Sequence, residues 1–281
     1  MGELYNRYFA LTLGDKRIAS ETVDGAKNLL LNVEFSVERT TKADANTAEI
    51  SIYNLTESTR SEISKKGIAT ALEVGYSGKS SVIFSGGMDY GRTVKSGPDW
   101  ITTLQSTDGG RQLRDSRVNV SFKSGLSASG ALQAVADTLG VNVGNSVEQL
   151  KRGNIKGALK SFGNGLVMSG PSKRELDQLI RAFGFEWSIQ DGALQILEPG
   201  QILEPGLIIK LGPTTGLIGS PQTGENGIVE ARSLLIPALT PGRGVELESA
   251  LIKGRHRVER VVFSGGTYSD AWFADLELRP V

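Results

Sequence analysis

Few side chains in the sequence could carry out catalysis. The 281-residue chain has one histidine, His256, and no cysteine. A Ser-His-Asp triad would have to use His256, and disulfides, thiolate metal sites and cysteine nucleophiles are excluded. Alternation places His256 on the apolar side of a strand with Ile252 and Val258, so we expect it to be partly buried and structural. The opposite side carries charged residues, which we interpret as a solvated face rather than a site for phosphate or an acidic partner: Lys253, Arg255, Arg257 and Glu259.

Carboxylates are the remaining groups for acid–base or metal chemistry. They are scattered along the sequence: Glu57, Glu62, Asp89, Asp108 and Asp115. A glycosidase needs two carboxyl groups that face each other across the bond to be cleaved. Since the sequence clusters no such pair, a glycan-cleaving site stays open only as an alternative.

Glycine-rich and aromatic segments point to structure rather than to binding. Residues 85–87 and 264–266 both read Ser-Gly-Gly, without the Gly-Lys-Ser/Thr or GxGxxG pattern of phosphate-binding loops, so we expect bulges or turns. Trp100, Trp187 and Trp272 fall within strand-like segments, where filling a core is more common than forming a sugar platform. We therefore assign no catalytic, cofactor-binding or metal-binding residue and expect a protein that is not an enzyme.

Composition excludes several function classes. Lys and Arg number 31, as do Asp and Glu, and a zero net charge disfavours general nucleic-acid binding. Hydrophobic residues at 39% and charged residues at 22% indicate a globular chain, and 35 glycines indicate many short strands and turns. No apolar run approaches a membrane span and the first residues do not resemble a signal peptide, so we expect assembly in the cytoplasm.

Period-two alternation predicts the first β region. The clearest strand covers residues 29–37, and shorter strands follow around Ile50, Val74 and Thr102. Thr56 can cap a short helix that ends before Gly67. We expect these strands to form one antiparallel barrel or sandwich.

Helical periodicity over longer segments appears in the middle of the chain. Ser127 precedes an apolar stripe that predicts a helix over residues 128–139, ended by Gly140. Ser172 and Glu175 form a capping-box pattern that predicts a second helix, ended by Gly184. A hairpin then turns at residues 191–192, which read Asp-Gly.

An exact repeat, Gln-Ile-Leu-Glu-Pro-Gly, occurs twice over residues 195–206. Each Pro-Gly suits a type II turn, so we interpret the repeat as a lengthened loop that tolerates deletion of one copy rather than as a binding repeat. Strand-like runs return afterwards and predict a second β domain. The expected fold is mainly β, with two barrel-like antiparallel domains at 1–118 and 198–281 that flank a small α/β unit at 119–197.

The order of these segments resembles the baseplate hub proteins of phage tails and related injection machines. The resemblance rests on three stretches: residues 48–60 with 72–76 and 83–86 for a first barrel, residues 132–139 with 172–192 for an α/β insertion, and residues 216–221 with 234–242 for a second barrel. It covers most of the chain.

The resemblance implies a structural, non-enzymatic role without a cofactor. It implies a homotrimeric ring that joins the tail tube, or tube-initiator proteins, to the central spike, contacts other baseplate proteins, and adapts six-fold to three-fold symmetry around a channel for DNA. Such a protein would be part of the virion tail baseplate, without sequence-specific nucleic-acid binding or a membrane span. The alternatives are a tail-associated cell-wall glycan hydrolase and a carbohydrate-binding tail adaptor that uses exposed tryptophans.

Overall fold

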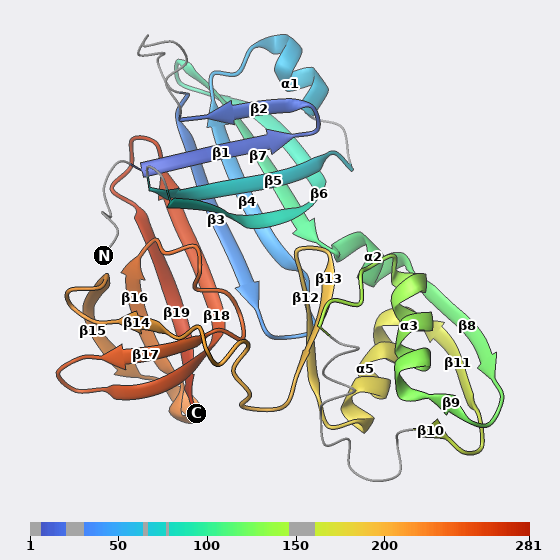
Figure 1. Ribbon diagram of the computed structural model, residues 1–281. Helices are drawn as coiled ribbons and strands as arrows, with labels where there is room; N and C mark the ends of the chain where they lie inside the picture. Colours follow the sequence, from blue (N-terminus) through green and yellow to red (C-terminus); the bar gives the residue numbers. More distant parts are fainter. Residues whose placement is uncertain (1–6, 21–30, 64–66, 77–78, 146–160) are drawn as a thin grey trace.

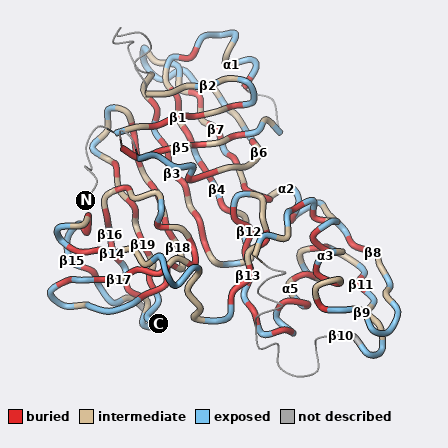
Figure 2. The backbone as a smooth tube through the Cα atoms, in the orientation of Figure 1, coloured by how far each residue is buried: buried red, intermediate tan, exposed pale blue. Residues whose placement is uncertain are grey.

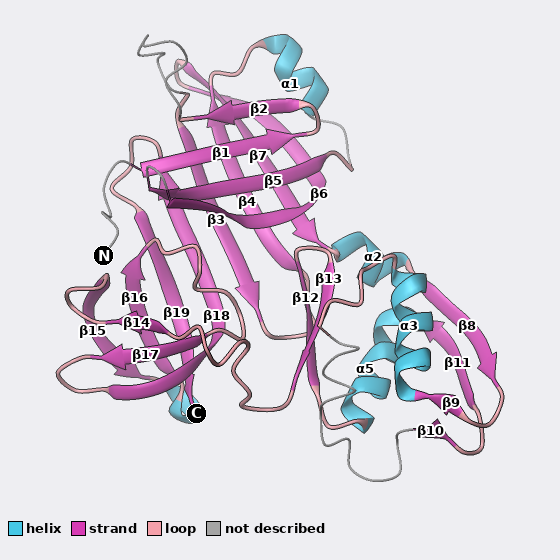
Figure 3. Ribbon diagram, in the orientation of Figure 1, coloured by secondary structure: helices cyan, strands magenta, loops and turns pink. Residues whose placement is uncertain are grey.

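The computed structural model describes residues 7–20, 31–63, 67–76, 79–145 and 161–281 (Figure 1). These residues form a mainly β protein, as the alternation predicts. Apart from one short helix beside the first strands, the α-helices lie together in the middle part of the chain (Figure 3).

The elements follow the order expected from the sequence. The first β region contains β1 (Arg7–Leu13), β2 (Lys16–Ala19), β3 (Val33–Thr40), β4 (Asn46–Tyr53), α1 (Glu57–Ile63), β5 (Ala69–Tyr76), β6 (Lys79–Ser96) and β7 (Asp99–Asp108). The middle α/β unit contains α2 (Gly110–Asp115), β8 (Arg117–Phe122), β9 (Leu126–Ser127), α3 (Ala128–Leu139), β10 (Ser161–Phe162), β11 (Leu166–Pro171), α5 (Ser172–Ala182), β12 (Glu186–Gln190) and β13 (Ala193–Leu197). The last β region contains β14 (Ile209–Leu211), β15 (Leu217–Thr223), the 3-10 helix η2 (Glu225–Gly227), β16 (Val229–Leu234), β17 (Gly244–Glu248), β18 (Lys253–Gly266) and β19 (Trp272–Pro280).

Strands of the first and last β regions share one large sheet. Its order is β15-β16-β19-β18-β3-β4-β7-β6-β5-β1-β2, with β17 on β18 and β14 on β17. The two regions meet where β18 pairs antiparallel with β3, placing Phe263 opposite Val37. Beyond β6 the sheet turns back, so that β5, β1 and β2 cross over β3, β4 and β7 in Figure 1. The described strands leave β15 and β2 at its two ends, so the sheet they form is not closed into a barrel.

The sheet contains the same four-stranded arrangement twice. In the first β region the hairpins β3–β4 and β6–β7 are joined by pairing of β4 with β7, and β5 extends β6. In the last region the hairpins β15–β16 and β18–β19 are joined by pairing of β16 with β19, and β17 extends β18. We call these the first and second four-stranded units. This duplication concerns strand order and strand pairing rather than residue identity, so it could not be predicted from the sequence.

The described residues bury two hydrophobic clusters (Figure 2). The larger cluster lies inside the large sheet and includes Phe35 and Leu72 of the first region with Val261 and Phe263 of the last. The smaller cluster lies in and beside the α/β unit and extends from Leu113 to Ile196. In β3, β4 and β19 the apolar residues on one parity face the larger cluster, as period-two alternation requires.

The strand predictions are largely confirmed. β3 begins at Val33 and ends at Thr40, so the strand expected at 29–37 lies later in the chain; residues 29–30 are outside the described residues. The strands expected around Ile50, Val74 and Thr102 are β4, β5 and β7.

Both long helices occur at the predicted positions, but one cap differs. The hydroxyl of Ser127 accepts the N–H of Gly130 at 3.1 Å, and Gly140 ends α3 with φ 66°. The capping box predicted for α5 is wrong. Pro171 occupies the N-cap without a side-chain cap bond, and the Ser172 hydroxyl contacts Thr138 of α3 at 3.2 Å. Ser172 therefore joins the two helices.

The glycines of the two Ser-Gly-Gly stretches lie within β6 and β18 rather than at the bulges or turns predicted there. The irregular residues in these strands are Ile83, Asp89 and Glu259. A Cβ on Gly265 would overlap the rings of Phe35 and Trp272, so this glycine permits close approach of β18 to its neighbours.

The repeat at 195–206 is packed rather than loose. Its first copy starts in β13 and ends in a turn closed by the N–H of Gln201 and the carbonyl of Glu198 at 2.9 Å, with φ 79° at Gly200 as a type II turn requires. Gly206 has no positive φ, so the type II prediction is wrong for the second copy. There the N–H of Leu203 donates to the carbonyl of Gly242 at 2.7 Å.

Candidate functional site

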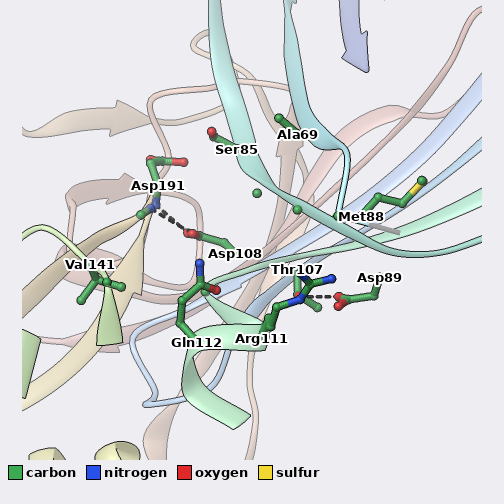
Figure 4. Close-up of a pocket in the computed structure, with 16 residues that line it drawn as sticks. Ala69, Ser85, Met88, Asp89, Thr107, Asp108, Arg111, Gln112, Val141 and Asp191 are labelled. Atoms are coloured by element: carbon green, nitrogen blue, oxygen red, sulfur yellow. Dashed lines mark hydrogen bonds between the residues drawn. The ribbon is translucent and has the colours of Figure 1, made fainter. Parts of the chain in front are cut away.

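The end of β7 opens into a pocket of about 330 Å³ beside the hairpin β12–β13 (Figure 4). Two of the scattered carboxylates, Asp89 and Asp108, line this pocket together with Asp191, Arg111 and Thr107. Two of the predicted candidate acids therefore share one cavity.

Asp108 is buried, with 2% of its surface exposed. Its Oδ2 accepts the N–H of Asp191 at 2.6 Å and its Oδ1 accepts the N–H of Gly192 at 2.9 Å. Asn46 of β4 lies alongside, with Nδ2 at 3.4 Å from Oδ2. Burial raises the pKa of Asp108, while these hydrogen bonds act in the opposite direction. The carboxylate thus holds the turn of the β12–β13 hairpin onto the large sheet.

Asp89 lies at a bulge, where β6 carries one residue more than β7. Its carboxylate accepts a short hydrogen bond from the hydroxyl of Thr107. Both oxygens of Asp108 already accept backbone N–H groups of the hairpin turn, so this carboxyl group is engaged in holding the turn. The pocket therefore suits attachment of the hairpin better than acid–base catalysis.

The other candidate acids lie elsewhere. Glu57 and Glu62 belong to α1, and Asp115 ends α2 with its carboxylate 3.0 Å from Nε of Arg114. None of these three lines the pocket. In the described part of the chain, no three His, Asp or Glu side chains form a group that could hold a metal ion.

His256 is buried, at 3% exposure, and its Nδ1 lies 3.0 Å from the carbonyl oxygen of Gly254. The predicted structural role agrees with this position.

The prediction of a solvated charged face is wrong for Arg257, which is fully buried. Its side chain points away from His256 and Val258, but that side of β18 is covered by β12 and the repeat. Nη2 contacts Glu186 at 2.8 Å, and Nε contacts Glu259 at 2.8 Å. Nη1 points at the carbonyl oxygens of both repeat copies, those of Glu198 and Gln201, at 3.4 Å each.

Arg39 of β3 is a second buried arginine, and the sequence reasoning missed it. Its Nη2 contacts Asp191 at 2.7 Å, its Nε contacts the amide oxygen of Gln190 at 3.2 Å, and its Nη1 donates to the carbonyl of Ile83 at 3.0 Å. Arg39 has the same parity as Phe35 and Val37 in β3, and this alternation could have placed it inside. Arg39 and Arg257 together fix the hairpin β12–β13 to the large sheet.

A comparison with family sequence models decides which proteins this chain resembles. The model of the family described as baseplate hub gp41 matches residues 10–254. The chain belongs to the baseplate hub gp41 family.

Solved structures with a similar fold come from tails and related machines. This hub-family chain superimposes on the 43 kDa tail protein of prophage MuSo2 from Shewanella oneidensis with a TM-score of 0.67, at 10% identity and over 98% of each chain. A tail protein from Neisseria meningitidis MC58 gives a TM-score of 0.63, at 10% identity, over 98% of this chain and 96% of that one. At such identities the likeness concerns the fold.

A third similar structure is the E. coli c3393 protein, described as a component of the type VI secretion system with structural similarity to the T4 phage tail proteins gp27 and gp5. Its TM-score is 0.57, at 9% identity, over 96% of this chain and 76% of that one. A comparison with curated proteins gives no match. Within the described residues of the hub-family chain, no helix is long and apolar enough to cross a membrane.

The three tryptophans of the hub-family chain divide into two groups. Trp187 and Trp272 are each 4% exposed, as predicted for core residues. The same prediction is wrong for Trp100, which is 39% exposed at the start of β7. The guanidinium of Arg60 lies 4.4 Å from the centre of its ring, and Nζ of Lys95 lies 5.7 Å from it. The chain therefore presents an aromatic edge at the end of the first four-stranded unit.

The face of the eight strands from β15 to β6 that points away from the core is largely polar. One row across it contains Arg232, Asp275, Val262, Glu38 and Thr47. Nε of Arg232 lies 2.7 Å from Asp275, and Nε of Arg260 lies 2.6 Å from Glu38. The hydrogen bond from Arg260 lowers the pKa of Glu38. These arginines of the hub-family chain are therefore neutralised within the sheet.

Proposed function

We propose that this chain is the structural hub of a phage tail baseplate. In this proposal three copies form a ring that joins the tail tube, or tube-initiator proteins, to the central spike and contacts other baseplate proteins. The hub family and the similarity of nearly the whole fold to two tail proteins support this assignment. The protein would assemble in the host cytoplasm and remain in the tail baseplate of the virion.

The observation that carries the proposal is the duplicated four-stranded unit. Each unit has the same strand order and the same pairing, and both lie in one continuous sheet. Three chains would therefore present six similar units to a tube with six-fold symmetry and three identical faces to a spike with three-fold symmetry. Such a ring adapts one symmetry to the other with a single type of subunit.

We propose that the polar face of the eight strands lines the channel for DNA. A passage for DNA has to avoid strong contacts with phosphate, because each unpaired cation would add electrostatic affinity. Carboxylates outnumber guanidinium groups on the rows of this face. The acidic residues are Glu34, Glu38, Glu49, Asp99, Glu230, Asp275 and Glu277, and the basic ones are Arg92, Arg232, Arg260 and Arg279, with Arg257 opposite Arg279 but buried under β12.

We also propose the division into two barrel-like β domains, 1–118 and 198–281, around the α/β unit at 119–197. The separate buried cluster supports a distinct middle unit, because most of its residues lie between Ala128 and Ile196. The hub role needs no catalytic residue, cofactor or metal, and none is assigned.

Solution mass and particle shape test the proposal. Light scattering on the purified protein should give about three times the 30.0 kDa chain mass, and negative-stain electron microscopy should give rings. The ring should bind purified tube and spike proteins of the same phage. A monomer without affinity for either protein would contradict the hub role.

A cell-wall glycan hydrolase is the second candidate, because Asp89 and Asp108 line one pocket. Digestion of purified peptidoglycan by the wild type, lost in Asp89→Asn, would favour this alternative. We expect no digestion, since both oxygens of Asp108 are occupied by the hairpin turn. A carbohydrate-binding adaptor is less favoured, because Arg60 covers the ring of Trp100.

A further inference from the structure

The second half of β6 has no partner strand on one side. Residues 79–87 of β6 pair with β5, whereas residues 90–96 pair, within the described residues, only with β7. At the other end of the eight-strand face, β15 pairs only with β16 in the described residues. Each strand therefore leaves a row of backbone N–H and C=O groups at an open edge, which is a template for another strand.

The second half of β6 corresponds to the second half of β18. Both strands carry one extra residue against their hairpin partner, Asp89 in β6 and Glu259 in β18. Before the bulge β6 pairs with β5, and β18 pairs with β17. After the bulge β18 pairs with β3, and this contact joins the two units within the chain. The position that β3 occupies beside β18 is vacant beside β6 among the described strands.

Two tryptophans mark these equivalent positions. Lys95, five residues after Tyr90 at the end of the β6 bulge, pairs with Trp100. Gly265, five residues after Arg260 at the end of the β18 bulge, pairs with Trp272. Trp272 packs edge-to-face on Phe35 of β3, with ring centroids 5.6 Å apart, and is 4% exposed. Trp100 shares the inward parity of the buried Thr102 and Leu104, yet it is 39% exposed. It occupies the position equivalent to that of Trp272 without the neighbouring unit, and the guanidinium of Arg60 lies 4.4 Å from the centre of its ring.

Strand directions allow the two open edges to join. Neighbouring strands from β15 to β6 are antiparallel throughout, so their directions alternate across the eight strands. β15 and β6 therefore run in opposite directions. When copies are arranged head to tail around an axis, β6 of one copy meets β15 of the next as an antiparallel pair.

We propose that residues 90–96 of β6 pair with β15 of a second copy of this chain, and that Trp100 is buried in this contact. The proposal rests on the proposed ring and names the surfaces that close it. Ser264 lies opposite Ser36 at the joint within the chain. Val94 is equivalent to Ser264, because each lies four residues after the end of its bulge. Gln222 lies opposite Glu230, and Ser36 lies opposite Glu49. Since Glu230 and Glu49 are equivalent in the two units, Gln222 is equivalent to Ser36.

The register between copies follows from these equivalences: Val94 of one copy lies opposite Gln222 of the next. Ser96 lies opposite Ile218, which is 40% exposed in the single chain. Trp100 reaches the bulge of β15 between Ile218 and Gln222, which contains the buried Pro221. Pro221 has no N–H to donate, so in this proposal the hydrogen bonds between the two copies form before and after the bulge rather than at it.

The natural chain has no cysteine, so a designed disulfide tests the register directly. The double variant Val94→Cys, Gln222→Cys should oxidise to covalent species that end at three chains on a non-reducing gel, and reductant should return them to one chain. The matched control Val94→Cys, Glu49→Cys places the second thiol in the middle of the same face and should give no specific product. Each single variant is a further control for random oxidation.

The outcomes separate this pairing from the hub role. A trimer by light scattering whose double-cysteine variant gives no more cross-linking than the Glu49 control would overturn the pairing and leave the hub in place. A monomer without cross-links would contradict both. Ladders beyond three chains would indicate an open filament and overturn the closed ring.

Trp100→Ala provides a second test that does not depend on thiol geometry. Loss of a buried interface tryptophan should weaken trimer association by about tenfold or more in sedimentation equilibrium. Val167→Ala, at a 71% exposed residue of the α/β unit, is the control and should leave association unchanged. Equal association of Trp100→Ala and wild type would contradict burial of Trp100 between copies.

Discussion

Nη2 of Arg257 lies 2.8 Å from Oε2 of Glu186, and this ion pair joins β18 of the large sheet to β12 of the α/β unit. The Arg257 side chain is 1% exposed, whereas that of Glu186 is 45% exposed. Removing Arg257 would leave Glu259 and two repeat carbonyls without their shared donor, while Glu186 could turn to water.

Arg257→Met should therefore lower the free energy of unfolding by about 3 kcal/mol, the scale expected when one member of a buried pair is removed. Urea denaturation followed by tryptophan fluorescence measures this change. Arg232→Met removes an exposed ion pair and should cost about 0–1 kcal/mol. Equal losses in the two variants would contradict the joining role of Arg257.

Asp108→Asn should change how stability depends on pH. Burial raises the pKa of Asp108, so the folded protein binds this proton more tightly than the unfolded chain does. Acidification through the raised pKa, down to the ordinary aspartate pKa, then favours the folded state. The unfolding free energy of the wild type minus that of Asp108→Asn should increase as pH falls through this window. A difference that decreases on acidification would be inconsistent with the buried, charged carboxylate.

Glu38→Gln should show the opposite sign. The hydrogen bond from Arg260 lowers the pKa of Glu38, so the ionised form stabilises the folded protein above the ordinary glutamate pKa. This contribution is lost as pH falls through the lowered pKa. The unfolding free energy of the wild type minus that of Glu38→Gln should therefore decrease on acidification, as measured by urea denaturation at a series of pH values. A constant difference would mean that the Arg260 contact is not maintained in solution.

Trp187→Ala should cost about 3–5 kcal/mol of unfolding free energy, because it removes a buried aromatic side chain from the smaller cluster. The loss includes the hydrogen bond from Nε1 to Asp177 at 3.0 Å. Thermal and urea unfolding of the variant measure this value. A loss below about 1 kcal/mol would show that Trp187 does not support this core.

Gly265→Ala should destabilise the protein by about 1–3 kcal/mol, since its Cβ would overlap Phe35 and Trp272. Gly87→Ala is the matched control: it also lies in a long bulged strand, but its Cβ would meet no atom within 4 Å. Calorimetry on both variants tests the difference. An equal effect would mean that the joint between β18 and β3 is loosely packed.

Local signals account for what the sequence predicted well. Ser127 and Gly140 define α3 through contacts within a few residues, and the Asp-Gly turn at 191–192 has φ 53° and 74° as a primed turn requires. The capping-box pattern at Ser172 failed because a contact with Thr138 competes for the same hydroxyl. Helix position survived this failure, since the apolar stripe of Leu176 and Ile180 determines it.

The candidate site depended on contacts between distant residues, which alternation cannot reveal. Asp108 and Asp191 are 83 positions apart, and only the folded hairpin brings the Asp191 N–H to the carboxylate. Alternation predicted the side of β18 on which Arg257 lies, but not that β12 would cover this side. Alternation correctly predicted that Trp100 points to the inner side of β7. It could not show that the neighbouring edge of β6 has no partner strand in the described single chain.

The position of the α/β unit in the chain has a consequence for protein engineering. The chain leaves the large sheet after β7 and returns to it at β14, and β8 to β13 form only separate two-stranded pairs. The two four-stranded units join directly through β18 and β3, so backbone pairing across this joint does not require the intervening strands. A foreign domain could therefore replace the α/β unit as a graft, if Arg39 and Arg257 were changed to apolar residues at the same time. In the proposed ring, each copy would then carry the foreign domain in the place of its own α/β unit.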